Sequence, residues 1–232
     1  MTIAYVLAGG FGKRLRKAVP DLPKPMALIG GRPFLEYLLD YWIEQGVSRF
    51  IISVGYLKDL IIKHFGKRYK NIPIEYFIEK VPLGTGGALI TIANQLSDVF
   101  IILNGDTFFE VSLDEALLFQ KINKVDFVMS LFEAAEGERY GIVDLKNEIW
   151  VDGINQIKKN KIGWANGGVY FANPSIFKQN NFKVGLAYSL EEDIIPELIS
   201  LGNIVGGQKQ KKKFLDIGIP SDYYRSKFFF GI

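Results

Sequence analysis

Apolar, strand-like runs alternate with helix-like segments through the first half of this 232-residue chain. Strands are expected at 3–7, 50–54, 74–78 and 100–103, and helices at 34–45, 57–65 and 85–95. Connections this short, in the order βαβαβαβ, favour a mainly parallel sheet with helices on both of its faces. The chain is therefore predicted to be an α/β protein.

The pattern changes after Asp126. Strands at 127–132, 141–145, 149–154 and 169–171 follow one another closely, and a helix is expected at 190–201. A last strand at 213–217 leads to a helix that begins at Pro220, a residue suited to a first helical turn. Because no linker or internal repeat divides the chain, we expect a single domain over 1–232 with a mixed sheet, made of the halves 1–125 and 126–232.

Composition limits the possible classes of function. Apolar residues make up 48% and charged residues 23%, as in soluble globular proteins, and no apolar run reaches the roughly 20 residues that span a bilayer. The lack of cysteine excludes thiolate nucleophiles and disulfides, and the lack of a signal peptide agrees with a cytoplasmic protein. The net charge is only +3, and the basic run at 209–213 is interpreted as a solvated loop or strand edge. Neither a nucleic acid nor a membrane is expected as a partner.

The first expected strand ends in a glycine-rich loop, Leu7-Ala8-Gly9-Gly10-Phe11-Gly12-Lys13-Arg14-Leu15. Glycines let main-chain N–H groups approach an anion, and the two cations that follow can neutralise phosphate oxygens. The carboxyl end of a strand is where α/β sheets bind ligands. Leu15 does not fit a dinucleotide fingerprint and Arg14 does not fit a Walker A loop. The alternative to a phosphate loop is a plain strand-to-helix turn.

A further cation, Lys24, stands between Pro23 and Pro25. The prolines stiffen the backbone around this side chain. Lys24 is either a solvent-exposed turn lysine or a lysine held near the glycine loop, where it would contact the phosphates of a nucleotide.

Several segments resemble, in order, the signature of the sugar-phosphate nucleotidylyltransferases. They are Gly9-Gly10-x-Gly12-x-Arg14-Leu15 with Pro23-Lys24-Pro25, the stretch from Glu79 to Ala88, Asn104-Gly105-Asp106, Tyr140-Gly141-Ile142-Val143, Asn166-Gly167-Gly168-Val169-Tyr170 and Phe214-Leu215-Asp216-Ile217-Gly218. Together these segments extend over nearly the whole chain. Within the family, the chain resembles the group that acts as D-glycero-α-D-manno-heptose 1-phosphate guanylyltransferases, compact members without a C-terminal β-helix domain.

The resemblance implies a Rossmann-like fold of the GT-A type. It also implies in-line attack by a sugar 1-phosphate on the α-phosphorus of a nucleoside triphosphate, which releases pyrophosphate and forms a sugar nucleotide for surface polysaccharide synthesis. Such a transfer needs positioning and charge neutralisation more than a protein nucleophile, which suits a chain with no cysteine and one histidine.

The resemblance assigns Mg²⁺ to Asp106 and Asp216. Each follows or ends an expected strand, near the edge where ligands bind. Magnesium takes one or two carboxylates together with phosphate oxygens and water. The alternative for each aspartate is to cap the following turn.

The nucleotide is assigned by the same resemblance to the glycine loop, and Arg14 and Lys24 join Asp106 as catalytic groups. Position 13 is usually threonine in the family, and the role of Lys13 stays open. Glu79 and Gly84 lie where the family binds the base. A carboxylate accepts hydrogen bonds, and guanine offers two adjacent donors, so GTP is favoured. Alternatively, Glu79 pairs with Lys80. The full set of expected nucleotide-binding residues is Leu7, Ala8, Gly9, Gly10, Gly12, Lys13, Arg14, Glu79, Gly84 and Thr85.

The sugar phosphate is assigned by the resemblance to Tyr140, Gly141, Asn166 and Glu191. Glu191 could equally be first-turn helix charge. The family's Glu-Lys pair before the Asn-Gly-Gly segment is absent, and Lys158 or Lys159 is expected to replace its lysine.

Other functions stay open from the sequence. Another sugar 1-phosphate or another base is possible, as is a sugar-nucleotide-binding module without catalysis. A glycosyltransferase of the GT-A fold would need an Asp-x-Asp motif, which Asp106-Thr107-Phe108 does not provide. His64 is expected at the surface, and the aromatic residues between 223 and 230 are expected to pack a helix or form a homodimer interface.

Overall fold

A computed structural model describes residues 2–10, 12, 14–16, 18–79, 81–135, 140–154, 162–179, 182–201 and 205–232. The chain forms two compact units that interleave along the sequence. The first unit consists of Met1–Pro82, Ile102–Phe108 and Phe214–Ile232, and the second of Leu83–Ile101 and Phe109–Lys213. The expected halves 1–125 and 126–232 concern ligand binding and stay a prediction.

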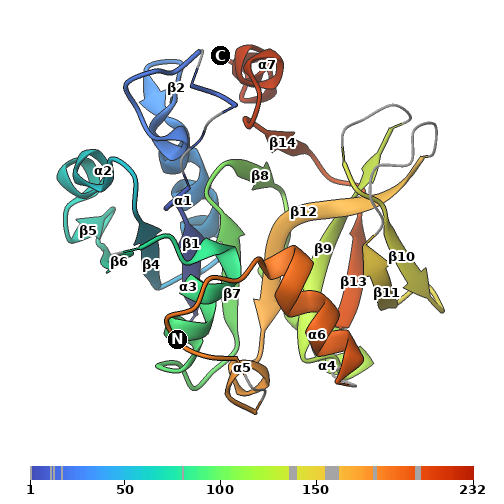
Figure 1. The fold of residues 1–232 in the computed structure, drawn as a ribbon. Helices are drawn as coiled ribbons and strands as arrows, with labels where there is room; N and C mark the ends of the chain where they lie inside the picture. The colour runs from blue at the N-terminus through green and yellow to red at the C-terminus, as the bar shows by residue number, and fades with distance from the viewer. Residues whose placement is uncertain are drawn as a thin grey trace. The chain divides into compact units, whose positions relative to one another are not determined.

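The first unit is built on three parallel strands, β1 (Ile3–Leu7), β4 (Arg49–Val54) and β6 (Ile72–Ile78), which lie side by side in Figure 1. Helices α1 (Phe34–Glu44) and α2 (Lys58–Phe65) connect them. The short strand β5 (Arg68–Tyr69) pairs with β6 at the edge, and β2 (Leu28–Ile29) pairs with β3 (Arg32–Pro33). A 3₁₀ turn at Lys24–Met26, strand β14 (Phe214–Asp216) and helix α7 (Pro220–Phe229) complete the unit.

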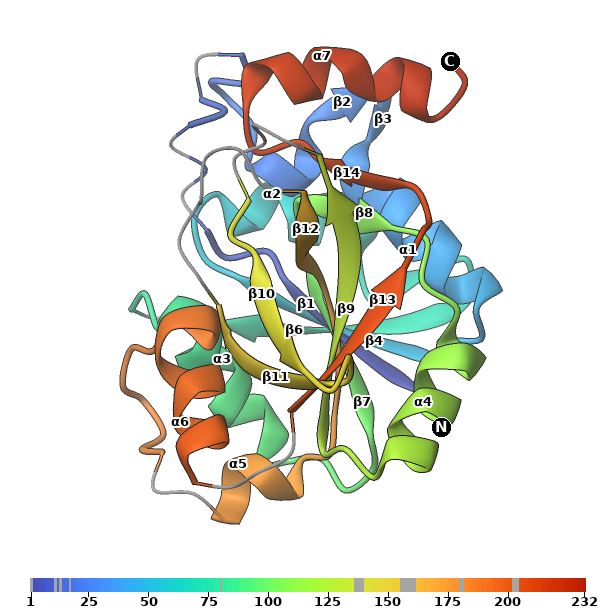
Figure 2. The same cartoon turned by 90° about the vertical axis from the view of Figure 1, so that its right-hand side faces the viewer.

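The second unit is a mixed sheet with helices. Its strands are β9 (Phe127–Ala134), β10 (Val143–Lys146), β11 (Trp150–Ile154), β12 (Gly163–Ala172) and β13 (Val205–Gln210). They follow one another in the sheet as β10-β11-β13-β9-β12, and Figure 2 draws β9, β10, β11 and β13 close together. β12 is antiparallel to β9, whereas β13 is parallel to it. The helices are α3 (Gly84–Ala93), α4 (Leu113–Asn123), α5 (Ser175–Gln179) and α6 (Ile195–Ser200), which follows a π-helical turn at Leu190–Ile194.

Two strands are divided between the units. β7 (Phe100–Asn104) and β8 (Thr107–Phe109) each begin in one unit and end in the other. The strand order β10-β11-β13-β9-β12-β7-β1-β4-β6-β5 makes one ten-stranded sheet, and β8 pairs separately with β14. The prediction of a mixed, mainly parallel sheet with helices is confirmed.

Apolar periodicity explains why these segments fold as they do. In α1, the residues Phe34, Leu35, Leu38, Leu39 and Trp42 recur at helical spacing and are all buried. Burying one such side chain contributes roughly 1.5–3 kcal/mol. Among the described residues, no helix has both the length and the apolar character needed to cross a bilayer.

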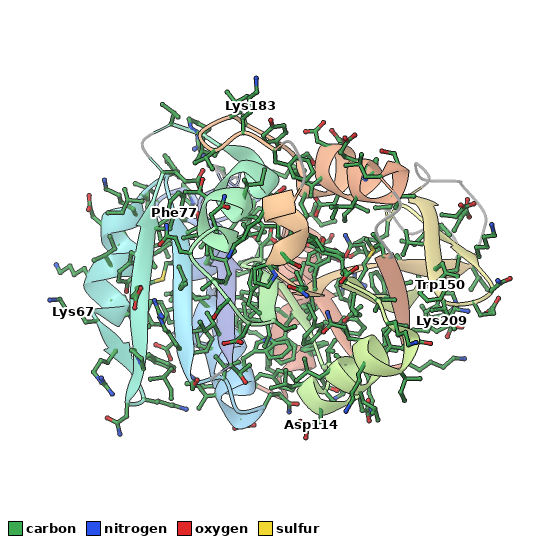
Figure 3. The ribbon with its side chains drawn as sticks, turned by 90° about the horizontal axis from the view of Figure 1, so that it is seen from below. Lys67, Phe77, Asp114, Trp150, Lys183 and Lys209 are labelled. Carbon is green, nitrogen blue, oxygen red and sulfur yellow. The ribbon has the colours of Figure 1, made fainter. Side chains whose placement is uncertain are left out.

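Several details differ from the sequence-based expectations. The basic run does not begin at a sheet edge, because Lys209 (labelled in Figure 3) lies in β13, between β11 and β9, with its Nζ 5.5 Å from the centre of the Trp164 ring. Helix α4 was not expected. The helix expected at 190–201 begins with a π turn, since Pro196 lacks an N–H group and its ring crowds the carbonyl one turn earlier.

The aromatic residues near 223–230 pack against the first unit in the expected way. Phe229 and Phe230 contact Phe108 edge-on, and Phe230 stacks on Tyr37 with 4.3 Å between the ring centres. Phe228 stays exposed, and a homodimer stays a prediction. His64 is exposed, as expected, and its Nε2 atom lies 2.7 Å from Glu36 Oε1.

Candidate functional site

A lysine and an aspartate from distant parts of the sequence meet in the first unit. Lys24 opens the 3₁₀ turn between its two prolines, and Asp106 lies in the turn between β7 and β8. Lys24 Nζ donates to Asp106 Oδ2 at 2.7 Å, and the two side chains are 13% and 31% exposed. Lys24 is thus a fixed, largely buried cation and not a free turn lysine.

The glycine loop lies against this lysine. Gly12 has a positive φ of 58°, and a Cβ atom at this position would lie 2.9 Å from Lys24 Cγ. Glycine is required here both for the backbone conformation and for the close approach. Arg14 follows in an exposed turn, while Lys13 lies outside the described residues. Of the two expected phosphate-binding cations that are described, Lys24 is fixed beside the loop and Arg14 is turned toward solvent.

A backbone hydrogen bond connects the neighbour of Asp216, the second candidate metal ligand, to the turn that contains Asp106. Asp216 ends β14, and the N–H of the next residue, Ile217, donates to the carbonyl oxygen of Asp106 at 3.1 Å. Asp216 Oδ1 also accepts a 2.5 Å hydrogen bond from the Gly218 N–H. Asp216 therefore does cap the following turn, as the alternative interpretation expected. A carboxylate that caps a turn still has other lone pairs with which it can bind a cation.

Within the described residues, no group of three or more His, Asp or Glu side chains gathers at one place. A cation here would depend on Asp106 and Asp216 together with oxygens of the ligand and water. That donor set fits magnesium, which is usually held by one or two carboxylates plus phosphate oxygens.

Glu79 lies directly beside the glycine loop. It follows β6, its N–H donates to the Val54 carbonyl at 3.0 Å, and its Oε1 accepts a 2.8 Å hydrogen bond from the hydroxyl of Ser53. A Cβ atom at Gly9 would lie 2.2 Å from Glu79 Oε1, so the carboxylate touches the loop main chain. Lys80 lies outside the described residues, and the alternative pairing with it is not described.

Four side chains expected or quoted for ligand binding form a partly buried network in the second unit. Tyr170 OH donates to Glu191 Oε1 at 2.9 Å and accepts from Asn166 Nδ2 at 2.6 Å. Thr85 Oγ1 donates to Glu191 Oε2 at 3.4 Å and accepts from the Leu190 N–H at 2.8 Å. Burial raises the pKa of the Tyr170 hydroxyl well above its ordinary value, and the charge of Glu191 raises it further. Tyr170 therefore remains a proton donor at neutral pH.

The other expected residues of this unit make contacts of their own. Gly84 is the first residue of α3. In the same helix, the Gly86 N–H donates to the carbonyl of Tyr188 at 2.8 Å, and Tyr188 lies two residues before the start of the π turn that contains Glu191. Tyr140 contacts Phe132 edge-on, with Gly141 half-buried beside it in sequence. Lys158 and Lys159 lie outside the described residues.

Two residues of these clusters were given no role from the sequence. Tyr170 belongs to a segment that carried the family resemblance, so that segment contained a signal for it. Ser53 lies in an apolar strand with nothing around it that suggests a polar contact. A buried serine in a strand indicates a polar contact only when the residues of the neighbouring strands that lie beside it are known.

The sequence model of the family described as nucleotidyl transferase matches residues 3–230. Two relatives carry the name D-glycero-alpha-D-manno-heptose 1-phosphate guanylyltransferase. The one from Aneurinibacillus thermoaerophilus is 39% identical over 97% of this chain and 96% of its own length. The one from Campylobacter jejuni subsp. jejuni serotype O:2 is 34% identical over 95% of this chain and 96% of its own length.

Solved structures agree with these matches. The crystal structure of HddC from Yersinia pseudotuberculosis is 33% identical, with a TM-score of 0.87 over 99% of this chain and 100% of that one. The same protein complexed with GMP-PN gives a TM-score of 0.86 at the same identity and coverage.

Proposed function

The chain belongs to the nucleotidyl transferase family, and on this premise we propose that it transfers GMP from GTP to a sugar 1-phosphate. The acceptor proposed is D-glycero-α-D-manno-heptose 1-phosphate, because two relatives that match nearly the whole chain are named for that reaction. The products are pyrophosphate and a GDP-sugar for surface polysaccharide synthesis. A cytoplasmic location is part of the proposal, since a chain without cysteine suits a reducing compartment.

One observation carries the assignment to this chain's own residues. Lys24 is bonded to Asp106, and the backbone of Ile217 connects Asp106 to the end of β14, where Asp216 lies. A cation that lies against the glycine loop is thus bonded to one carboxylate, and the strand end that carries a second carboxylate is bonded to the same turn. This is the charge arrangement that holding a triphosphate with a divalent cation requires.

In the proposed reaction, an oxygen of the sugar phosphate attacks the α-phosphorus of GTP. The bond from the α-phosphorus to the bridging oxygen breaks, and pyrophosphate leaves with that oxygen. Lys24 and Arg14 neutralise charge on the phosphates, and the N–H groups of the glycine loop orient them. Asp106 and Asp216 would hold Mg²⁺, which supplies additional positive charge against the phosphate oxygens.

The remaining residues are assigned to the base or to the sugar phosphate. Glu79 accepts hydrogen bonds from the guanine edge, and Gly84 and Thr85 lie along the nucleotide. Asn166 and Glu191 bind the sugar hydroxyls, with Tyr140 and Gly141 beside them, and Lys158 binds the sugar's phosphate. The proposal treats the chain as one nucleotidyltransferase domain, with a nucleotide half and a sugar-phosphate half.

Pyrophosphate release from a matrix of substrates tests the proposal. GTP, ATP, UTP, dTTP and CTP are each combined with heptose, mannose, glucose and N-acetylglucosamine 1-phosphates, with and without Mg²⁺. We expect the fastest release with GTP and the heptose phosphate, and none after chelation. Release that is fastest with a different pair would reassign the substrates. A protein that binds GTP but releases no pyrophosphate with any acceptor would be a binding module.

A further inference from the structure

Ser53 makes a polar contact that the proposed reaction does not itself explain. This serine is fully buried on β4, between β1 and β6, and its hydroxyl donates to Glu79 Oε1 at 2.8 Å. The main chain of Ser53 is also engaged, since the Ala8 N–H donates to the Ser53 carbonyl at 3.0 Å. One strand residue therefore contacts both the start of the glycine loop and the carboxylate beside that loop.

The bond from Ser53 restrains a side chain that would otherwise be mobile. A glutamate has several rotatable bonds, and holding one rotamer costs conformational entropy. A hydrogen bond to an ionised group is among the stronger polar contacts, and a buried hydroxyl is costly without a partner. The bond therefore favours the rotamer in which Glu79 faces Ser53.

Gly9 limits the carboxylate from the other side. Because a Cβ at Gly9 would lie 2.2 Å from Oε1, this oxygen occupies the space that a side chain would fill. Glu79 Oε1 is thus held between the Ser53 hydroxyl and the loop main chain. A carboxylate can accept about four hydrogen bonds, so it can keep the bond from Ser53 while it accepts others from a ligand.

We propose that Ser53 is a positioning residue for base selection, which fixes the Glu79 carboxylate so that it accepts the two adjacent donors of guanine. This inference rests on the proposed role of Glu79. A fixed carboxylate also weakens the binding of other bases. Adenine would present a ring nitrogen lone pair to it, and uracil would present carbonyl oxygens beside its single donor, and each of these lone pairs repels a carboxylate oxygen. A carboxylate that can turn away imposes a smaller penalty on those bases.

The test is the ratio of kcat/KM for GTP to kcat/KM for ATP and UTP, measured on one preparation of each variant. A ratio does not depend on the fraction of folded enzyme, so a purely structural role would leave it unchanged. Ser53→Ala should lower the ratio by about tenfold, the size expected for one hydrogen bond to a charged group. An unchanged ratio in Ser53→Ala overturns the inference.

Ser130 provides a matched control. It is also a fully buried strand serine, on β9, and among the described residues its hydroxyl has no hydrogen-bond partner. Ser130→Ala should keep the ratio of the unmodified protein. If Ser130→Ala lowers the ratio as much as Ser53→Ala does, the effect comes from losing any buried hydroxyl, and the inference is wrong.

Two further measurements separate this inference from the proposed function. Ser53→Ala should have no additional effect on the ratio in a Glu79→Ala background, because Ser53 acts through the side chain that this background removes. Ser53→Cys, which keeps the volume with a weak donor, should resemble Ser53→Ala. A wild-type preference for another triphosphate would remove guanine from the proposed function, yet the same ratio, taken for the preferred base, would still test Ser53. A wild type without any base preference overturns the role of Ser53.

Discussion

The ammonium group of Lys24 lies 2.7 Å from a carboxylate oxygen of Asp106. The cation proposed for the phosphates and the carboxylate proposed for the metal thus form an ion pair. Removing one partner leaves the other as an uncompensated, partly buried charge. Substitutions on the two sides of the pair should therefore have different consequences.

Replacing Lys24 by methionine should lower kcat/KM by about 10²–10³, because a fixed group that stabilises charge in the transition state contributes on this scale. Pyrophosphate release measured at saturating Mg²⁺ reports the loss. Lys67→Met is the control, since Lys67 is an exposed lysine of the same unit (Figure 3). A Lys24→Met protein that keeps most of its turnover would show that the lysine serves Asp106 alone.

Asp106→Asn should lower turnover by at least about 10² and raise the Mg²⁺ concentration needed for half-maximal activity, since an amide is a weaker ligand for a hard cation. The measurement is a Mg²⁺ titration of pyrophosphate release, paired with the thermal shift produced by GTP and Mg²⁺. Asp114→Asn, in the exposed first turn of α4, is the matched control. If the half-maximal Mg²⁺ concentration stays unchanged in Asp106→Asn, this residue does not hold the metal.

Tyr170→Phe should raise the KM for the sugar 1-phosphate several-fold and leave the KM for GTP nearly unchanged. The phenol hydroxyl bonds both Asn166 and Glu191, so its loss leaves a half-buried amide and a half-buried carboxylate each with one bond fewer, at a cost of about 1–3 kcal/mol. Tyr224→Phe removes an exposed hydroxyl on α7 and should change neither constant. Equal rises in both KM values would argue against a role confined to the sugar site.

Asp40 should contribute stability that disappears in acid. Burial alone would raise the pKa of Asp40, but hydrogen bonds from Lys70 and Arg32 outweigh burial and hold the pKa below its ordinary value. A carboxyl group whose pKa is lower in the folded state stabilises the protein above about pH 4 and loses this effect as the pH falls through its folded pKa.

Asp40→Asn should therefore flatten the acid side of the stability curve, by at most the slope for one proton, about 1.4 kcal/mol per pH unit. Urea unfolding between pH 2 and 6 measures this slope. Asp98→Asn replaces an exposed carboxylate and serves as the control. An Asp40→Asn curve as steep as that of the unmodified protein would contradict the prediction.

Much of the fold could be predicted because its strands are apolar and its helices periodic. The first strand was expected at 3–7 and is Ile3–Leu7, and the last helix begins at Pro220 as expected. Helix α4 was missed because Leu118 and Ile122 are exposed while Gln120 is buried, so its apolar residues do not form a single stripe. A signal for it exists in Ser112, which caps the helix by accepting from the Glu115 N–H.

Strand β13 could not be predicted from propensity. It contains Gly206 and Gly207, and glycine is depleted in strands. Side chains of other strands fill the space beside these glycines, because a Cβ at Gly207 would lie 2.6 Å from Leu145 and 2.8 Å from Leu131. Packing against neighbouring strands, and not intrinsic β-propensity, therefore determines that residues 205–210 form a strand.

For the candidate site, the sequence provided the residue types and the family resemblance, while the contacts needed the structure. Neither the spacing of Asp106 and Asp216 nor any periodicity predicts that the backbone of Ile217 bonds to Asp106. Likewise, the sequence does not reveal that Glu79 is paired with Ser53, because hydrogen bonds between side chains of neighbouring strands depend on register.

The interleaving of the two units has a consequence for how the protein is made. Residues 214–232, which belong to the first unit and contain Asp216, leave the ribosome after every residue of the second unit. The first unit therefore stays incomplete throughout translation of the second. We expect a ribosome-bound chain that ends before Phe214 to lack one of the two proposed magnesium ligands, so that a growing chain can bind metal and triphosphate fully only after the second unit has been translated.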